Sequence, residues 1–360
     1  MKSGKPAFVL ILTLLAGCYA PLLELTERDP GAVLQPVSRS NIIDARAKFR
    51  HIFCTVNQHH GKELPDYRRC DDALHRLADE GARPENAVDL VFQNKLQVYV
   101  IPGIFGECLI DQVSPFSFAI DHMMTHDVQI DVVPGILGRA TSSHNAEIIH
   151  DFFFDTVKKT EDEKLLVIAY SKGTTDMLWY LGNDQYASSH SKVDALISVA
   201  GVVNGTPLAD GANSLMKKLA EKFPLGTCPK QDGSAIDDLT RRQQLLRSSS
   251  QKIPVHIKYY SVVAYTDRAN VSRILKPFHR RLSLVDPRND SQVIYYDSVI
   301  PTAHLLGYAN ADHWVVALPF ERGKPLSGLL HRSIALGADK NAYPREVLVE
   351  AILRYVDMDL

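Results

Sequence analysis

Apolar runs alternate with longer amphipathic stretches along most of this 360-residue chain. The apolar runs predict buried strands at residues 97–101, 128–133, 165–169, 195–203, 255–266 and 305–309. Between them, apolar positions at helical spacing predict helices at residues 143–159, 174–181 and 272–285. Strands that alternate with helices in this way predict an α/β fold, a mostly parallel sheet with helices on both faces.

Two further regions depart from this rhythm. Residues 41–56 and 71–80 have helical spacing, and Gly81 ends the second stretch, so two helices are expected before the sheet. Residues 205–252 interrupt the sheet pattern later in the chain. Within them, residues 215–223 and 236–249 are expected to be helical, separated by prolines and glycines.

The composition is that of an ordinary globular protein. The chain is 45% apolar and 23% charged, which is enough to bury one large core. Its formal net charge is −2, and no basic cluster is interleaved with aromatic residues. A nucleic-acid partner is therefore not expected.

The N-terminus has the pattern of a targeting segment. Lys2 and Lys5 precede an apolar stretch of nine residues, 7–15, which is too short to span a bilayer as a helix. The sequence Leu-Ala-Gly-Cys ending at Cys18 resembles the bacterial lipobox, in which cleavage precedes a cysteine that is then lipidated. This resemblance implies a signal peptide at residues 1–17 and a membrane anchor on Cys18.

The anchor also carries an expectation about location. Residues 18–40 contain several prolines and a glycine and are expected to form a tether. The residue after the lipobox cysteine is Tyr19 rather than aspartate. In lipoproteins of Gram-negative cells, this resemblance implies sorting to the outer membrane. The body of the protein would be water-soluble on the periplasmic or surface face.

An exported chain meets an oxidising compartment, where cysteines pair. After the lipobox, four cysteines allow three pairings, and we favour Cys54–Cys70 with Cys108–Cys228 because the first two share one local segment. His122 and His126 are spaced four apart, as two metal ligands on a helix can be. No glutamate beside them completes a metalloprotease pattern, so no metal and no cofactor are expected.

The most informative stretch is the strand at 165–169, which leads through Ala169-Tyr170-Ser171-Lys172-Gly173 into a helix. A serine at a sharp strand-to-helix turn is a nucleophile elbow, G-x-S-x-G in its common form. The turn strains the serine backbone and needs small neighbours, here Ala169 and Gly173. Ser171 is therefore the predicted nucleophile.

With this elbow and three other motifs, the chain resembles the α/β-hydrolase-fold serine esterases and lipases. The four motifs are IPGIFG, IAYSKG, SVAGVVNGTPLAD and YANADHW, and the resemblance covers about residues 95–335. It implies one domain over residues 41–360, with 41–94 as an N-terminal helical extension. It also implies that residues 205–252 form a possible lid over the acyl pocket.

The family orders its catalytic residues as serine, acid and histidine, with the histidine after the last strand. His313 occupies that position. Asp290, in a turn similar to the lipase sequence Asn-Asp-Gly-x-Val, is the preferred acid. Asp297 is the alternative and Asp267 the third choice, whereas Asp312 is expected to be a loop or capping residue.

The resemblance also assigns the oxyanion hole, the pair of backbone amides that stabilise the developing negative charge. By position these are the amides of Ile104, in the turn after the first strand, and of Lys172. Pro102 replaces the histidine that is common in this turn, while Gly103 and Gly106 keep their places.

These residues predict a serine hydrolase that cleaves carboxylic esters through an acyl-enzyme on Ser171. Lipid or other hydrophobic esters are the expected substrates, and the membrane is reached through the lipid anchor. Two alternatives remain open: a catalytically silent envelope binding protein of the same fold, and an acyltransferase that uses the same acyl-enzyme. The sequence carries no prediction of oligomeric state.

Overall fold

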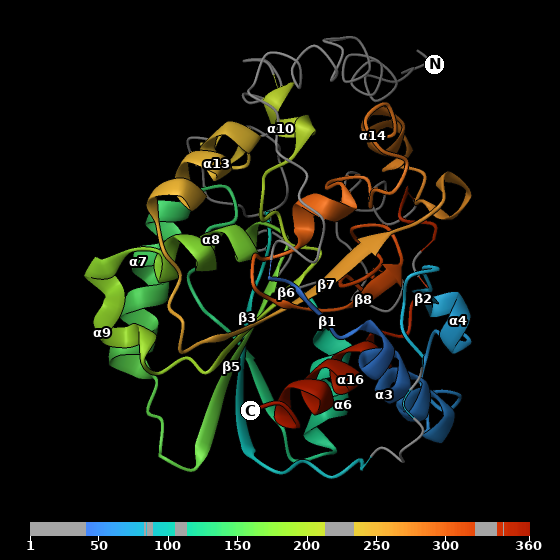
Figure 1. Ribbon diagram of the computed structural model, residues 1–360, viewed down its shortest axis with the longest axis horizontal. Coiled ribbons are helices and arrows are strands. Elements are labelled where there is room, and N and C mark those ends of the chain that lie inside the picture. Colours follow the sequence, from blue (N-terminus) through green and yellow to red (C-terminus); the bar gives the residue numbers. More distant parts are fainter. Residues whose placement is uncertain are drawn as a thin grey trace, which may run out of the picture.

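The protein is described here from a computed structural model, which describes residues 41–82, 84, 89–104, 114–212, 234–320, 337–340 and 342–360. An eight-stranded sheet forms its centre (Figure 1). The strands are β1 (Ile43–Asp44), β2 (Leu74–His75), β3 (Lys95–Ile101), β4 (Gln129–Val132), β5 (Glu163–Tyr170), β6 (Ala195–Val199), β7 (Lys258–Tyr265) and β8 (His304–Asn310).

Along the sheet the order is β1-β8-β7-β6-β5-β3-β4, and all six pairings on this path are parallel. The short strand β2 pairs with β8 in the antiparallel direction. A register irregularity between Ser261 and Val262 interrupts the β7–β8 ladder. The predicted mostly parallel sheet is therefore confirmed.

Helices cover both faces of the sheet (Figure 1). The α-helices are α3 (Arg46–His59), α4 (Cys70–Ala73), α6 (Ser117–Met124), α7 (Ser142–Asp151), α8 (Lys172–Leu181), α9 (Ala187–His190), α10 (Pro207–Asp210), α12 (Ala235–Asp238), α13 (Arg241–Ser250), α14 (Lys276–Leu282) and α16 (Arg345–Asp357). Four short helical turns are η2 (Phe152–Thr156), η3 (Asp184–Tyr186), η4 (Arg268–Asn270) and η5 (Tyr295–Ser298).

The central strand β5 shows why its apolar run has no polar face. Its alternate residues Leu166 and Ile168 pack into a core with α3, α6 and α16, while Leu165 and Val167 pack into a second core with α7 and α8. Side chains alternate between the faces of a strand, so a strand covered on both faces is apolar throughout. This confirms the expected layered arrangement.

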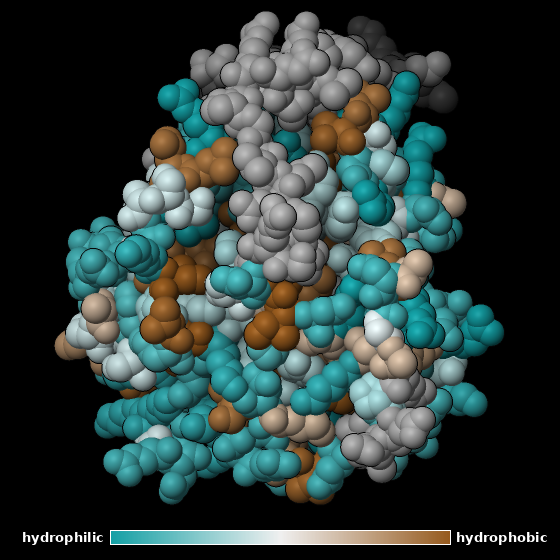
Figure 2. Space-filling model, in the orientation of Figure 1, coloured by the Kyte–Doolittle hydropathy of each residue, from teal (hydrophilic) through white to brown (hydrophobic). Residues whose placement is uncertain are grey.

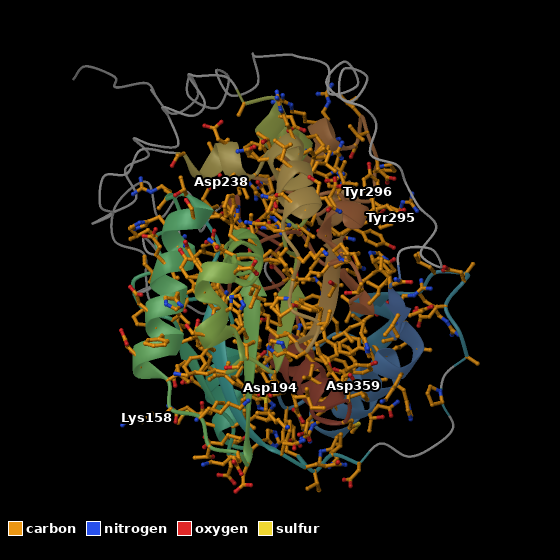
Figure 3. All side chains as sticks on the ribbon, turned by 60° about the vertical axis from the view of Figure 1, so that its left-hand side comes forward. Lys158, Asp194, Asp238, Tyr295, Tyr296 and Asp359 are labelled. Carbon is orange, nitrogen blue, oxygen red and sulfur yellow. A yellow bond between two sulfur atoms is a disulfide. The ribbon has the colours of Figure 1, made fainter. Side chains whose placement is uncertain are left out.

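Because the strands are parallel, their carboxyl ends meet at one edge of the sheet. Figure 3 shows the two edges: Asp194, directly before β6, and Asp359 lie toward one end of the molecule, whereas Asp238, Tyr295 and Tyr296 lie toward the other. Loops at the carboxyl edge of such sheets carry the binding sites. Ser171 and His313 both follow strand ends at this edge.

The N-terminal extension differs from expectation. The predicted helix at residues 71–80 is wrong: one helical turn, α4, is followed directly by strand β2 on the edge of the sheet. The backbone pairing with β8 overrides the helical spacing of this segment. The first predicted helix is present as α3, preceded by strand β1, so the extension is not purely helical.

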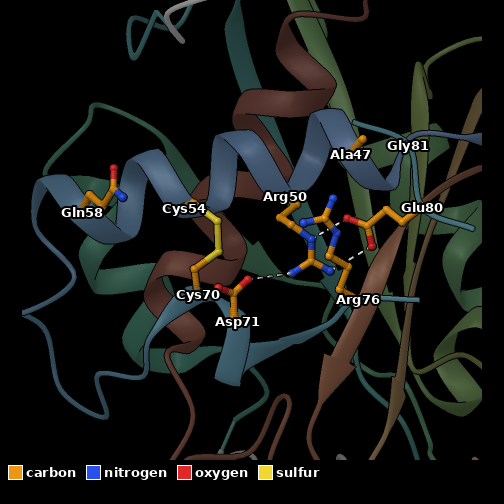
Figure 4. Close-up of a pocket in the computed structure, with 9 residues that line it drawn as sticks. All are labelled: Ala47, Arg50, Cys54, Gln58, Cys70, Asp71, Arg76, Glu80 and Gly81. Atoms are coloured by element: carbon orange, nitrogen blue, oxygen red, sulfur yellow. Dashed lines mark hydrogen bonds and ion pairs between the residues drawn. A yellow bond between two sulfur atoms is a disulfide. The ribbon is translucent and has the colours of Figure 1, made fainter. Parts of the chain in front are cut away.

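A disulfide joins α3 to α4 through Cys54 and Cys70, as expected. Cys108 and Cys228 lie outside the described residues. Beside the disulfide is a pocket of about 220 Å³ (Figure 4), across which Arg50 pairs with the buried carboxylate of Glu80 at 2.5 Å. None of the predicted catalytic residues lines this pocket.

The other predicted helices and strands that fall within the described residues are present, but their lengths differ from the predicted ones. The helix expected at residues 143–159 ends as an α-helix at Asp151 and continues as the π-helical turn η2. The helix expected at residues 215–223 lies outside the described residues. Within the described ranges, no helix combines the length and the apolar character needed to cross a bilayer.

Candidate active site

Ser171 occupies the turn between β5 and α8 in a backbone conformation that few residues adopt, with φ of 56° and ψ of −125°. A positive φ is sterically costly for a residue with a side chain. Two hydrogen bonds hold it: the Ser171 amide donates to the Val199 carbonyl and the Ser171 carbonyl accepts from the Val202 amide, both at 3.2 Å. The loop after β6 therefore fixes the strained turn.

Two motif glycines explain how the turn fits against its neighbours. A Cβ atom on Gly173 would lie 2.5 Å from the carbonyl oxygen of Ile101, at the end of β3. A Cβ atom on Gly103 would lie 2.7 Å from the Cβ of Ser171 itself. Both separations are too short for any residue but glycine. The loop after β3 thus brings its backbone directly against the serine.

The side chain of Lys172 points into the core, away from the turn. Its Nζ lies 2.6 Å from Oδ1 of Asp176, one helical turn later, and both side chains are fully buried. The amide of Asn145, on α7, donates to the other Asp176 oxygen at 2.8 Å. This buried pair connects the elbow helix to α7, while the backbone amide of Lys172 starts α8 and has no acceptor within the helix.

Three side chains predicted from sequence meet at this turn. The Nε2 atom of His313 lies 2.8 Å from Oγ of Ser171, and its Nδ1 atom lies 2.6 Å from Oδ2 of Asp290. All three residues are buried. The His313 amide also donates to the Asp290 carbonyl at 2.8 Å, so backbone and side chain both join the histidine to this aspartate.

The turn that carries Asp290 is built around its carboxylate. Oδ1 accepts hydrogen bonds from the amides of Gln292 at 2.8 Å and Val293 at 2.7 Å, which leaves Oδ2 for His313. Ser291 stands where the similar lipase turn has glycine, and its φ is 86°. The position therefore requires the left-handed conformation although the residue is a serine.

Sequence reasoning did not find Tyr170, the residue before the nucleophile. Its hydroxyl donates to the carbonyl of His313 at 2.7 Å, and its side chain is buried with its ring centroid 5.3 Å from that of His313. Nothing in the local sequence marks this role, because the partner lies 143 residues away. From sequence, Tyr170 is only the variable residue of the elbow, between Ala169 and Ser171.

The alternative acids lie elsewhere. Asp297 accepts a hydrogen bond from Nη2 of Arg241, on α13, at 2.6 Å rather than contacting His313. Burial raises the pKa of Asp297 to about 7, although the nearby Arg241 opposes this shift. Asp267 is exposed at the start of η4. The carboxylate that contacts His313 is therefore that of Asp290 and not that of either alternative.

Asp312, beside His313 in sequence, caps the loop that follows. One carboxylate oxygen accepts from the amide of Ser272 at 2.7 Å, and the other accepts from the amides of Trp314 and Val315 at 3.1 and 2.9 Å. Its carboxylate thus holds the backbone directly after His313 and joins it to Ser272. The expectation of a capping residue is confirmed.

The described part of the 205–252 insertion is attached to the loops of the site. Thr206 donates through Oγ1 to the Gln292 carbonyl at 2.5 Å, and Arg241 binds Asp297 by its side chain and Asp210 by its backbone amide. The three helices α10, α12 and α13 therefore pack beside the Asp290 turn. Residues 213–233 of the insertion lie outside the described residues.

Comparison with solved structures supplies the family of this fold. No protein-family model matches the chain, and no curated protein matches it. Among solved structures, a metagenomic carboxyl esterase, MGS0156, is 34% identical with a TM-score of 0.85, and the match covers 95% of this chain and all of that one.

Two lipases share the fold at low identity. The mature Bacillus licheniformis lipase BlEst2 is 17% identical with a TM-score of 0.50, covering 64% of this chain and 89% of that one. The Staphylococcus hyicus lipase is 11% identical with a TM-score of 0.53, covering 76% and 97%. On its fold and on its likeness to MGS0156, the chain belongs to the carboxyl esterases of the α/β-hydrolase fold, enzymes that hydrolyse carboxylic esters.

Proposed function

We propose that this esterase cleaves its substrates through an acyl-enzyme on Ser171, with His313 as the general base and Asp290 as the acid that orients it. The observation that carries the proposal is the unbroken relay from Ser171 Oγ through both ring nitrogens of His313 to Asp290 Oδ2, at 2.8 and 2.6 Å. These separations are within hydrogen-bond reach for both proton transfers.

The direction of the relay follows from the partners of Asp290. Its carboxylate already accepts two backbone amides, so it acts as an acceptor toward Nδ1–H of His313. That tautomer leaves the lone pair of Nε2 facing the Ser171 hydroxyl. When Nε2 takes the serine proton, Asp290 stabilises the imidazolium that forms.

The reaction then proceeds in two halves. Ser171 Oγ attacks the ester carbonyl, and the resulting oxyanion is held by the backbone amides of Ile104 and Lys172. His313 returns the proton to the leaving alcohol, which departs and leaves the acyl group on Ser171. Water, deprotonated by the same histidine, attacks the acyl-enzyme and releases the carboxylic acid.

Two features support these amides as the oxyanion hole. The Lys172 amide begins α8, where the partial positive charge of the helix N-terminus also favours an anion. Ile104 directly follows Gly103, whose backbone lies against the Ser171 side chain. A carbonyl oxygen bound at Ser171 would therefore meet backbone from both sides.

We further propose that the substrates are hydrophobic esters. The insertion helix α13 exposes Leu245 and Leu246, with 43% and 54% of their surface accessible, and Leu284 is 46% exposed just after α14. Figure 2 shows hydrophobic surface where Figure 1 places α13. Exposed leucines on a helix of the insertion suit acyl chains or a lipid surface, as expected of a lid.

The proposed setting is the cell envelope, with the protein attached to the membrane through a lipid on Cys18. The disulfide between Cys54 and Cys70 supports export, since disulfides persist in oxidising compartments. Labelling cells that produce the chain with a radioactive fatty acid tests this anchor. Label in the native chain and none in Cys18→Ala supports it, and label in neither contradicts it.

Hydrolysis of p-nitrophenyl esters from acetate to palmitate tests the catalytic proposal. We expect the native chain and Ser188→Ala, which removes an exposed serine on α9, to hydrolyse them equally. Ser171→Ala should be inactive with an unchanged circular dichroism spectrum. A preference for the longer chains supports hydrophobic substrates, whereas activity confined to acetate contradicts that part of the proposal.

A further inference from the structure

Four side chains outside the catalytic site converge between three helices, and we name them the histidine–glutamate cluster: His60, His122, His126 and Glu350. His60 caps the C-terminus of α3, His122 lies on α6 with His126 just beyond its end, and Glu350 lies on α16. These helices pack together on one face of the sheet (Figure 1). The hydrogen bonds that join Ser171, His313 and Asp290 involve none of these four residues.

The donor atoms of the cluster face one point. The Nε2 atoms of His60 and His122 each lie 2.7 Å from the same carboxylate oxygen, Oε2 of Glu350, and Nε2 of His126 lies 3.6 Å from it. All four donor atoms lie within 4.8 Å of one another. Around a tetrahedral zinc ion with bonds of about 2.0–2.2 Å, neighbouring ligand atoms lie about 3.4 Å apart. This distance falls within the range of separations between the four donor atoms, 2.7 to 4.8 Å.

Hydrogen bonding alone leaves this cluster incomplete. Glu350 Oε2 faces three ring nitrogens, and Nε2 of His126 is buried without a hydrogen-bond partner. A buried polar atom left in this way is costly. One cation at the centre would accept a lone pair from every donor atom at once.

The surroundings of the cluster hold the donors in place. Arg354 binds the other oxygen of Glu350 at 2.7 Å through Nε and through Nη2, which turns Oε2 toward the histidines. Nδ1 of His60 lies 3.1 Å from Nδ1 of His59, a contact that can fix its tautomer.

We propose that His60, His122, His126 and Glu350 bind one zinc ion in a closed tetrahedral site. Three imidazoles and one carboxylate suit zinc rather than calcium or magnesium, which prefer oxygen ligands. Since the protein supplies all four ligands, the ion has no open position for a substrate and its role is structural. It joins α3 to α16 across 290 residues of sequence, and both to α6.

This proposal departs from the expectation of no metal. The spacing of His122 and His126 indicated a pair of ligands, but no glutamate lies beside them in sequence. The glutamate lies 228 residues after His122. Only the packing of α16 against α6 brings it to the pair.

Zinc titration of the full chain tests the proposal, after metal is stripped with a chelator and the chelator removed. His126→Ala is the variant, because His126 makes no hydrogen bond through Nε2 and, at 26%, is the most exposed of the four side chains. His144→Ala, on the exposed surface of α7, is the matched control. We expect the native chain and the control to bind one equivalent of zinc calorimetrically, and the variant about tenfold more weakly or not at all.

Thermal unfolding supplies a second readout. Zinc that binds only the folded chain raises the midpoint of unfolding with concentration, and this rise should be present in the native chain and His144→Ala but reduced in His126→Ala. The milder change His126→Gln serves if the alanine variant does not fold. The proposal is overturned if the native chain binds no stoichiometric zinc, or if the His126 variant binds it as tightly as the control does.

Discussion

The hydroxyl of Tyr170 donates a hydrogen bond of 2.7 Å to the main-chain carbonyl of His313. The amide of the same histidine donates to the carbonyl of Asp290. Both backbone polar groups of His313 are therefore held, the carbonyl by the neighbour of Ser171 and the amide by Asp290. Burial, together with the carboxylates of Asp290 and Asp312, raises the pKa of Tyr170 well above its ordinary value. The hydroxyl therefore keeps its proton and remains a donor at every pH of interest.

Tyr170→Phe should lower kcat about tenfold while KM changes little. One hydrogen bond contributes about 1 kcal/mol, and about 1.4 kcal/mol of activation free energy corresponds to a tenfold change in rate. The phenyl ring keeps the packing, and only the restraint on His313 is lost. Tyr180→Phe is the matched control, because it removes a buried hydroxyl that bonds Ser189 away from the triad. We expect the control to lose stability but not kcat. Equal kcat values in the two variants would show that Tyr170 has no positioning role.

Asp290→Asn should reduce turnover by about ten-thousand-fold, because an amide in place of the carboxylate favours the wrong tautomer of His313. Asp297→Asn should retain most of the activity, since Asp297 contacts Arg241 and not the histidine. Steady-state hydrolysis of one soluble ester by both variants measures the difference. A collapse of turnover in Asp297→Asn with Asp290→Asn left active would reverse the assignment.

Ser291→Gly should stabilise the protein by about 1 kcal/mol, because glycine adopts a φ of 86° without the strain that a side chain brings. The Ser291 hydroxyl is buried with no hydrogen-bond partner, so no contact is lost with it. Urea unfolding measures the change. Ser188→Gly, in helix α9, is the control and should destabilise instead. A less stable Ser291→Gly protein would mean that the turn tolerates serine without strain.

The buried carboxyl of Asp297 predicts a pH dependence of stability. Its pKa is about 7 in the folded state, against about 4 when unfolded, so between these values the folded chain holds one proton more. The free energy of unfolding should then fall by about 1.4 kcal/mol per pH unit as the pH rises from 4 to 7, relative to Asp297→Asn. Urea unfolding of both proteins at pH 5 and pH 6.5 measures this; parallel slopes would show that Asp297 is ionised throughout.

Much of the fold follows from local sequence because its signals are local. The apolar run at residues 165–169 and the small residues around Ser171 together mark a buried strand and a strained turn, and both are present as β5 and the elbow. The turn at Asp290 was indicated by its similarity to a lipase turn. Asp297 lies in a turn that is also similar to a lipase turn. Only the structure shows which aspartate pairs with His313, because the carboxylate of Asp297 is bonded to Arg241 instead.

What the sequence could not show depends on contacts between distant segments. Residues 71–80 have helical spacing, yet Leu74 and His75 pair with β8 more than 230 residues later. The partner of Tyr170 lies 143 residues away, and the glutamate beside His122 lies 228 residues away. Periodicity reports which face of an element is buried, not what covers it.

The central claim is that Ser171 is activated by His313, and covalent labelling by a fluorophosphonate tests it most directly, since the reagent reacts only with an activated serine. A protein of residues 19–360, which omits the expected signal peptide and Cys18, is treated with the reagent beside its Ser171→Ala variant. Both are treated with and without detergent, and their intact masses are compared. We predict one adduct on the native chain and none on the variant. A folded native chain that remains unlabelled in both conditions, or a variant that labels equally, would contradict the account.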